Sequence, residues 1–370
     1  MAFATIDLTK GVTGVLPSAN ATYSTPRENA VPLIINGDMA VAQRSTSVTG
    51  HNAVSYTTVD RFKTVCEVGT YTVIQESLSS GAAYESGFKN ALRLDCTTAE
   101  ATAGSAGEQT TVEQRIEGFN LQAFKKGTSN AEKFTLAFWV KASKTGSNLQ
   151  VNLIDQDNSR MIGGTYDISS ADTWEHKVVN FAADTTGAFG DDNGNSLTIE
   201  WFLDGGSNYS GGAVPTAWET KSNADRNVTN FDLAGSTDND WAITGVQLEV
   251  GEFSSTTLPP FQFENFGDNL ARCQRYFFKP TAKYSNAGTS YSMASLDMEV
   301  TATVDFPTRM RDDPTFTVGT NNFRDDDNTG VTANVSHIST DGHGYGMKKT
   351  GASNEHYGIL FYGQTYDAEL

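Results

Sequence analysis

The sequence is poor in cysteine and has no long apolar run. Its three cysteines, Cys66, Cys96 and Cys273, are odd in number and form no Cys-x-x-Cys motif. Neither a disulfide-stabilised scaffold nor a zinc site is predicted from such a set. No run approaches the roughly 20 apolar residues that span a bilayer, and the first twenty residues lack the basic start and apolar block of a secretory signal. We therefore expect a soluble protein, made in a reducing compartment, without membrane insertion.

Basic residues are also scarce. The 370 residues include 26 Lys and Arg against 44 Asp and Glu, which gives a formal net charge of −18. Nucleic acids and anionic membrane surfaces bind cationic protein faces, so neither is predicted as a partner. Charged residues make up only 19% of the chain, whereas glycine is abundant (34) and aromatic residues reach 11%. This composition is typical of all-β proteins with many turns.

Period-two alternation supports the all-β interpretation. The two clearest cases place on one face Phe134, Leu136, Phe138 and Val140, and likewise Leu197, Ile199, Trp201 and Leu203. Strands are predicted at 33–35, 56–65, 69–75, 90–95, 111–117, 133–142, 149–154, 175–181, 197–203 and 241–250. With turn-rich segments between them and no helical pattern, these runs predict a jelly-roll β-sandwich over residues 33–265.

The regions on either side of this sandwich have a different character. Residues 1–32 are poor in large apolar groups and contain Pro26 and Pro32, so we expect a short extended arm that gains order only from another chain, or else a free terminus. Pro259-Pro260 indicates a linker, and 267–275 is predicted to be a short junction helix with Asp268 as its N-cap. Strand-like runs resume over 266–370 and predict a smaller C-terminal β-sandwich.

Sequence motifs of enzymes are not found. There is no Gly-x-Ser-x-Gly elbow, phosphate-binding loop, His-Glu-x-x-His or dinucleotide fingerprint. Acidic runs at Asp191-Asp192 and 325–327 leave glycoside hydrolysis open, because that reaction needs two nearby carboxyl groups. Solvated acidic loops are the simpler interpretation, and the chain is predicted not to be an enzyme.

Aromatic residues near Gly- and Asn-rich loops are the candidate sugar-binding residues. They are Tyr209 and Trp218 beside the loop 205–212, and His343, Tyr345 and Tyr357 in the C-terminal region. A flat apolar ring beside fixed hydrogen-bonding groups suits a pyranose. A packing role remains the alternative for each residue, and Trp201, on the inward phase of its strand, is expected in the core.

Oxygen-bearing side chains cluster in two segments. They are Asp184, Asp191, Asp192, Asn193 and Asn195 in the first, and Asp238, Asn239 and Asp240 in the second. Neither matches an EF-hand loop. The residues alone leave open both a structural calcium ion and acidic turns without any ion.

An ordered series of motifs extends over most of the chain. It comprises Leu33-Ile-Ile-Asn-Gly-Asp-Met39, Ala42-Gln-Arg44, Val59-Asp-Arg-Phe62, Gln114-Arg-Ile-Glu117, Thr135-Leu-Ala-Phe-Trp-Val-Lys-Ala-Ser143, Thr173-Trp-Glu175, Ile243-Thr-Gly-Val-Gln-Leu-Glu-Val-Gly251, Leu270-Ala-Arg-Cys-Gln-Arg-Tyr276, Phe306-Pro-Thr-Arg-Met-Arg-Asp-Asp-Pro314 and Tyr366-Asp-Ala-Glu-Leu370. In this order the series resembles the jelly-roll domain of tail-fibre proteins of tailed bacteriophages. Thr13-Gly-Val-Leu-Pro17 resembles the short element that often precedes fibre domains.

This resemblance implies a virion appendage, assembled in the bacterial host cytoplasm, that binds a host-surface glycan through its β-sandwiches. It also implies a homotrimer whose arm, residues 1–32, attaches to other virion proteins. The arm residues expected to make that attachment are Phe3, Ile6, Leu8, Val12, Val15 and Leu16. The arm is shorter than that of many fibres, and no shaft repeat is visible. A virion structural or decoration protein without a receptor role is therefore the alternative, and a polysaccharide depolymerase is a further one.

The jelly roll is also similar to calcium-containing carbohydrate-binding modules. In those modules an Asn-Gly-Asp near the first strand and an Asp before the last strand share one structural ion. The matching residues here are Asn36-Gly37-Asp38 and Asp240. The resemblance therefore implies a structural Ca²⁺ bound jointly by Asp38 and Asp240.

Overall fold

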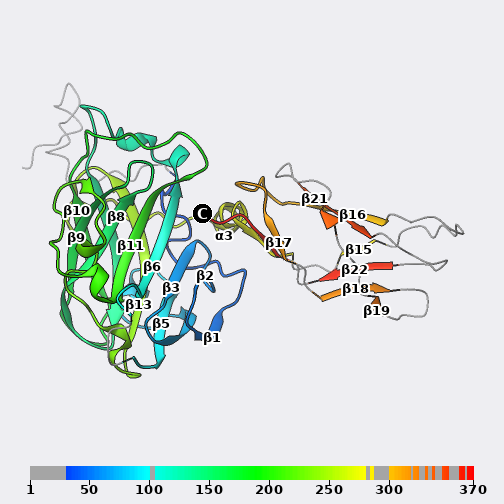
Figure 1. The fold of residues 1–370 in the computed structure, drawn as a ribbon, viewed down its shortest axis with the longest axis horizontal. Coiled ribbons are helices and arrows are strands. Elements are labelled where there is room, and N and C mark those ends of the chain that lie inside the picture. The colour runs from blue at the N-terminus through cyan, green and yellow to red at the C-terminus, as the bar shows by residue number, and fades with distance from the viewer. Residues whose placement is uncertain are drawn as a thin grey trace, which may run out of the picture.

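The computed structural model describes residues 31–100, 105–280, 284–286, 300–317, 320–324, 330–331, 336–337, 344–349, 358–362 and 365–370. The fold is all-β, and its larger part is a jelly-roll β-sandwich of two stacked antiparallel sheets (Figure 1). The predicted arm, with Phe3, Ile6, Leu8, Val12, Val15 and Leu16, lies outside the described residues.

Two sheets make up the sandwich in the described part of the chain. The six-stranded sheet has the order β1 (Ser47–His51), β4 (Thr70–Ser77), β5 (Asn90–Thr98), β13 (Asp240–Val250), β7 (Phe134–Ala142) and β10 (Glu175–Phe181). The seven-stranded sheet has the order β12 (Glu219–Thr220), β9 (Arg160–Ile168), β8 (Gly146–Asp155), β11 (Asn195–Gly205), β6 (Gln109–Glu117), β3 (Phe62–Cys66) and β2 (Val54–Tyr56). Short helical segments lie in the connections: α2 (Ala82–Glu85), η2 (Gly118–Asn120), η3 (Gln122–Phe124), η4 (Ser207–Tyr209), η5 (Asn223–Asp225) and η6 (Leu233–Gly235).

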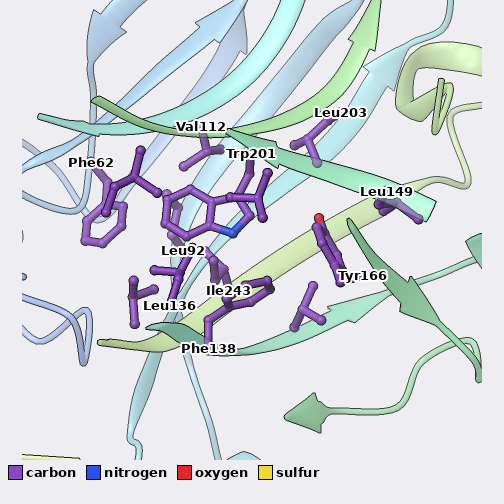
Figure 2. Close-up of a cluster of buried hydrophobic side chains, with 14 of the residues drawn as sticks. Phe62, Leu92, Val112, Leu136, Phe138, Leu149, Tyr166, Trp201, Leu203 and Ile243 are labelled. Carbon is purple, nitrogen blue, oxygen red and sulfur yellow. The ribbon is translucent and has the colours of Figure 1, made fainter. Parts of the chain in front are cut away.

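Aromatic side chains from both sheets fill the space between them. Trp201 of β11 is fully buried, as predicted, and lies at the centre of the cluster drawn in Figure 2. Its ring meets Phe138 of β7 edge-on with centroids 5.7 Å apart, and Phe138 meets Tyr166 of β9 in the same way at 5.1 Å. Both predicted alternations are confirmed, because all eight inward residues named for them are buried in this core.

The strand predictions fail at three kinds of position. The predicted strand 56–65 is not continuous: β2 ends at Tyr56, a turn follows at 57–61, and β3 begins at Phe62. Residues 33–35 form no strand and instead begin a loop in which Asn36 has a φ of 61°. The side chain of Asn36 replaces strand pairing there: its Nδ2 donates to the carbonyls of Val41 and Asp60, both at 2.9 Å. Conversely, β1 and β9 were not predicted, because their sequences carry little apolar alternation.

The junction helix is confirmed with shifted bounds. Helix α3 (Phe266–Gln274) begins after Asn265, whose side chain accepts a hydrogen bond from the Gly267 N–H, so the predicted N-cap Asp268 lies instead in the first turn. Cys273 of α3 is buried with Ile35 and the following Tyr276. The helix therefore packs against the loop that opens the jelly roll.

Ion pairs attach the end of the chain to the sandwich. The buried guanidinium of Arg61 pairs with Glu369 and lies 3.4 Å from the ring centroid of Tyr276. Arg275 donates two hydrogen bonds to Glu117, at 2.9 and 2.7 Å. Figure 1 shows the C-terminus beside α3.

The C-terminal region forms small antiparallel sheets beyond α3 (Figure 1). One contains β14 (Phe277–Phe278), β23 (Thr365–Asp367) and β17 (Thr315–Thr317). The second contains β15 (Tyr284–Asn286), β22 (Gly358–Tyr362), β18 (Thr320–Arg324) and β19 (Gly330–Val331), and the third β16 (Val300–Asp305), β21 (Gly344–Lys349) and β20 (Ser336–His337). The smaller C-terminal β-sandwich is thus present. Among the described residues, no helix has the length and apolar character needed to cross a membrane.

The central core yields a stability prediction. Phe138→Ala removes a fully buried ring that contacts both Trp201 and Tyr166. We expect the free energy of unfolding, measured by urea denaturation, to fall by about 3–5 kcal/mol. The control Val54→Ala, at a 46% exposed strand position, should change it by no more than about 0.5 kcal/mol. A similar loss in both variants would contradict the assignment of Phe138 to the main core.

Candidate functional site

The outer face of the six-stranded sheet carries an aromatic depression of about 300 Å³, which we call the Trp139 pocket. Its lining residues are Ser86, Phe88, Trp139, His176, Gly245, Gln247, Ser255, Leu258, Pro259, Pro260, Phe261 and Phe263. They come from β7, β10 and β13, from the loop after α2, and from the segment 255–263 that follows β13.

Strand alternation places Trp139 on this outer face. Its neighbours Phe138 and Val140 both point into the core, so Trp139 projects to the opposite side of the sheet and is only half-buried. His176 lies directly opposite on β10, and the two ring centroids are 5.1 Å apart. The indole and the imidazole together form the floor of the pocket.

Three phenylalanines form a wall beside this floor. The ring centroids of Phe88, Phe261 and Phe263 are 4.9–5.1 Å from one another, and Phe263 is 51% exposed. Gly245 lies in a bulge of β13 with a φ of +61°, where an added Cβ would come within 2.6 Å of Phe88 and 2.9 Å of Trp139. A glycine is therefore required where the wall meets the floor.

Polar groups at the pocket complete its chemistry. Gln247 donates from Nε2 to the carbonyl of Pro259 at 3.1 Å, which ties the segment 255–263 to β13. Burial lowers the pKa of His176, so its imidazole is neutral at pH 7 and offers one hydrogen-bond donor and one acceptor. Exposed Ser86 and Ser255 add hydroxyl groups at the rim. A flat apolar surface with adjacent hydrogen-bonding groups has the chemistry to hold a sugar ring.

The two aromatic residues predicted in the jelly roll lie elsewhere and are buried. Tyr209 is 7% exposed, and its hydroxyl donates to the carbonyl of Gly107 at 2.9 Å. Trp218 is 8% exposed, packs against Phe134, and donates from Nε1 to the carbonyl of Ala182 at 2.8 Å. Neither residue exposes a ring face, because the loop that carries them folds back onto the sandwich. Their placement therefore indicates a packing role.

The C-terminal candidates are only partly placed. Tyr345 lies on β21, in register with Val304 of β16. His343 and Tyr357 lie outside the described residues. Sugar binding by these three residues stays a prediction.

The structure does not bring Asp38 and Asp240 together, so the prediction that these two aspartates share one calcium ion is wrong. The carbonyl of Gly37 accepts from the N–H of Val246, six residues along β13 from Asp240, which separates the two aspartates by roughly 20 Å. Asp240 pairs with Arg93 at 2.9 Å, and Asp38 accepts from Asn269 at 3.2 Å.

One further acidic candidate for calcium, Asp184, has cationic partners. Asp184 pairs with Lys126 at 3.0 Å and with Arg160 at 2.8 Å. Within the described residues, no group of three or more His, Cys, Asp or Glu side chains is arranged to hold a metal ion. Calcium binding elsewhere in the chain stays a prediction.

The sequence did not predict the Trp139 pocket because the predicted site residues were sought in loops, whereas Trp139 is an outward-facing residue within a strand. The signal was present in the opposite phase: Trp139 interrupts the inward apolar series of β7, and two further aromatics, Phe261 and Phe263, follow Pro259-Pro260. What the sequence does not reveal is that the segment after β13 returns to β7.

The similarity of this chain to known proteins is limited to solved structures. No family model and no curated protein sequence matches this chain. Among solved structures, it is similar to a putative sugar-binding protein from Bacteroides thetaiotaomicron, with 14% identity and a TM-score of 0.30 over 60% of this chain and 100% of that chain. It is similar to the CBM22-1 xylan-binding domain of Paenibacillus barcinonensis Xyn10C, with 10% identity and a TM-score of 0.27 over 58% of this chain and 100% of that chain.

A third similar structure comes from a phage. It is the enzymatically active domain of tailspike protein 4 of bacteriophage CBA120, with 13% identity and a TM-score of 0.28. The match covers 59% of this chain but only 21% of the tailspike chain. Identities of 10–14% and TM-scores of 0.27–0.30 assign no ligand and no role to this chain.

The half-buried histidine of the pocket gives a pH prediction. The pKa of folded His176 lies below the ordinary value of 6.5, so the unfolded chain binds more protons there and stability is lost as pH falls through 6.5. We expect the free energy of unfolding to fall less in His176→Gln than in the wild type between about pH 7.5 and about pH 5, measured by urea denaturation. His51, whose pKa burial also lowers, provides the matched control His51→Gln, which should keep the His176 contribution. An unchanged pH dependence in His176→Gln would contradict the burial of this imidazole.

Proposed function

We propose that this chain is a non-enzymatic glycan-binding protein of a phage virion, which holds a sugar of the host surface in the Trp139 pocket. The observation that carries the sugar-binding half is the pocket itself. A half-buried indole and an exposed phenylalanine ring lie beside a neutral imidazole and two serine hydroxyls. Aromatic faces left open to solvent have an energetic cost that a stacked sugar ring removes.

The virion half of the proposal rests on the ordered motif series. Three of these motifs lie in described elements. The motif 135–143 covers most of β7, 243–251 covers most of β13 and the residue after it, and 270–276 covers the end of α3 and the two residues after it. The series thus follows the strands that carry the pocket and the helix at the junction. A protein with rigid all-β domains suits a surface appendage, because closely paired strands leave few open edges.

Glycan binding is tested directly on the full chain. We expect binding to a neutral glycan on an array of bacterial surface polysaccharides, and an affinity at least about tenfold lower in Trp139→Ala, measured by isothermal titration calorimetry. The matched control is Phe119→Ala, another exposed aromatic position, 52% exposed and outside the pocket. Unchanged affinity in Trp139→Ala, with its circular dichroism spectrum preserved, would overturn the site. New reducing ends after incubation with the bound polysaccharide would overturn the non-enzymatic role.

We further propose that the chain acts as a homotrimer attached to the virion by residues 1–32. Three weak sugar sites in one particle appendage raise avidity against a repeated surface glycan. We expect light scattering to give three times the chain mass of 39.9 kDa, and deletion of residues 1–32 to abolish incorporation into virions while both sandwiches stay folded. A monomeric full-length chain, or normal incorporation of the deletion variant, would contradict this.

A further inference from the structure

The lining of the Trp139 pocket limits the class of sugar that it can hold. None of the described residues that line it is a lysine, arginine, aspartate or glutamate. A sugar carboxylate would lose water there without gaining a counter-charge, and so would the ammonium group of a free amino sugar. The pocket therefore suits an uncharged sugar, which it can recognise only through apolar contacts and hydrogen bonds.

The phenylalanine wall offers apolar contact beyond the indole floor. One side of the Phe263 ring lies against Gly87, where an added Cβ would come within 3.1 Å of the ring. The residue nevertheless stays 51% exposed, so the ring is held in place and still presents apolar surface. A plain hexose has its C–H faces for the indole but only hydroxyl groups around its rim. The wall therefore fits a sugar that carries an apolar substituent at its rim.

One hydrogen-bond acceptor is open at the base of this wall. Gln247 is only 7% exposed and lines the pocket. Its Nε2 donates at 3.1 Å to the carbonyl of Pro259, two residues before Phe261 of the wall. No described residue donates to the other end of this amide, Oε1, so only solvent or a ligand can do so. A nearly buried acceptor without a donor is costly, and a ligand N–H or O–H would remove that cost.

The strand register places this acceptor close to the indole. On β7, the outward residue opposite Gln247 is Ala137, two positions before Trp139. Successive outward positions along a strand are about 7 Å apart. A pyranose ring on Trp139 therefore has a rim substituent within reach of Gln247. To satisfy the wall as well, that substituent needs a donor and an apolar group side by side.

We propose that the Trp139 pocket selects an N-acetylhexosamine, with its ring on Trp139, its acetamido N–H donating to Oε1 of Gln247 and its methyl group against Phe263. An acetamido group carries the donor and the methyl group next to each other, whereas a hydroxyl lacks the apolar part and a deoxy methyl lacks the donor. The inference rests on the proposed function and names the class of sugar taken by the same site. It makes Gln247 and Phe263 the residues that determine specificity.

The test compares methyl glycosides on the full chain by ligand-observed NMR titration. The probes are the β-glycosides of N-acetylglucosamine, of N-formylglucosamine, of glucose, and of glucose acetylated on its second hydroxyl, each repeated in the galacto configuration. In one configuration or both, we expect the N-acetyl glycoside to bind at least about tenfold more tightly than the other three. The formyl probe loses only the methyl group and the O-acetyl probe only the N–H, so each isolates one contact.

The variant Phe263→Ala tests the wall. We expect it to abolish the preference for the N-acetyl over the N-formyl glycoside, because the methyl group loses its partner ring. Saturation transfer from the protein to the acetyl methyl protons should weaken with it. The matched control is Phe266→Ala, at a 58% exposed phenylalanine three residues further on and outside the pocket lining, which should keep the wild-type preference. Should Phe263→Ala not fold, as judged by circular dichroism, the acetyl and formyl probes on the wild type decide.

The outcomes separate this inference from the proposed function. Equal affinity for the N-acetyl glycoside and the plain glycoside in both configurations overturns the inference and leaves a neutral sugar in the pocket. Binding of none of the probes, with a neutral glycan of the array still lost in Trp139→Ala, does the same. An N-acetyl preference that survives in Trp139→Ala places the sugar elsewhere and rejects the pocket together with the inference. Binding of no neutral glycan at all overturns both.

Discussion

The contact between the two sheets at Phe138 and Trp201 is the constraint on which the outer surfaces depend. Once these rings meet in the core, the period of two fixes the direction of every neighbour along β7 and β11. Trp139 then points outward on one sheet and Glu200 outward on the other. A one-residue slip of β7 would turn Trp139 into the core, and a slip of β11 would do the same to Glu200, so the register that stabilises the core also positions the Trp139 pocket.

The chain also covers part of each outer face. The segment 255–263 crosses the six-stranded sheet and is tied to it by Gln247. On the seven-stranded sheet, Arg226 reaches Glu200 and Gln109, and its guanidinium lies 5.0 Å from the ring centroid of Tyr209. The Trp139 pocket lies beside the segment 255–263 and is bounded by it. Because buried charges need partners, the Arg226–Glu200 ion pair holds its covering segment in one arrangement.

The sequence predicted the elements whose signal is local. Strands β7 and β11 were recognised from apolar alternation, and α3 from its polar start and amphipathic spacing. Strand β9 was missed because Gly163 and Gly164 interrupt its pattern. Gly164 is nonetheless required, since an added Cβ would come within 2.4 Å of Val179 on β10. Strand β9 forms because its residues fit against the edge of the other sheet, and no local sequence pattern reveals that contact.

The site residues were less predictable because they depend on long-range folding. Tyr209 and Trp218 are aromatic residues near a Gly-rich loop, a pattern that does not distinguish exposed rings from rings folded back onto the core. Asp38 and Asp240 matched a motif whose two halves lie at different points along β13. Trp139 was not recognised as a site residue, because the role of a single outward-facing residue is clear only when its cross-strand neighbours are known.

The forces that act at the Trp139 pocket follow from its lining. Contact area and desolvation dominate there, so affinity depends little on salt. The net charge of −18 repels anions over many ångströms, and this repulsion is screened beyond about 8–10 Å at physiological ionic strength. A neutral sugar is not repelled in this way, so a pocket of aromatic rings beside a neutral imidazole suits a ligand without charge.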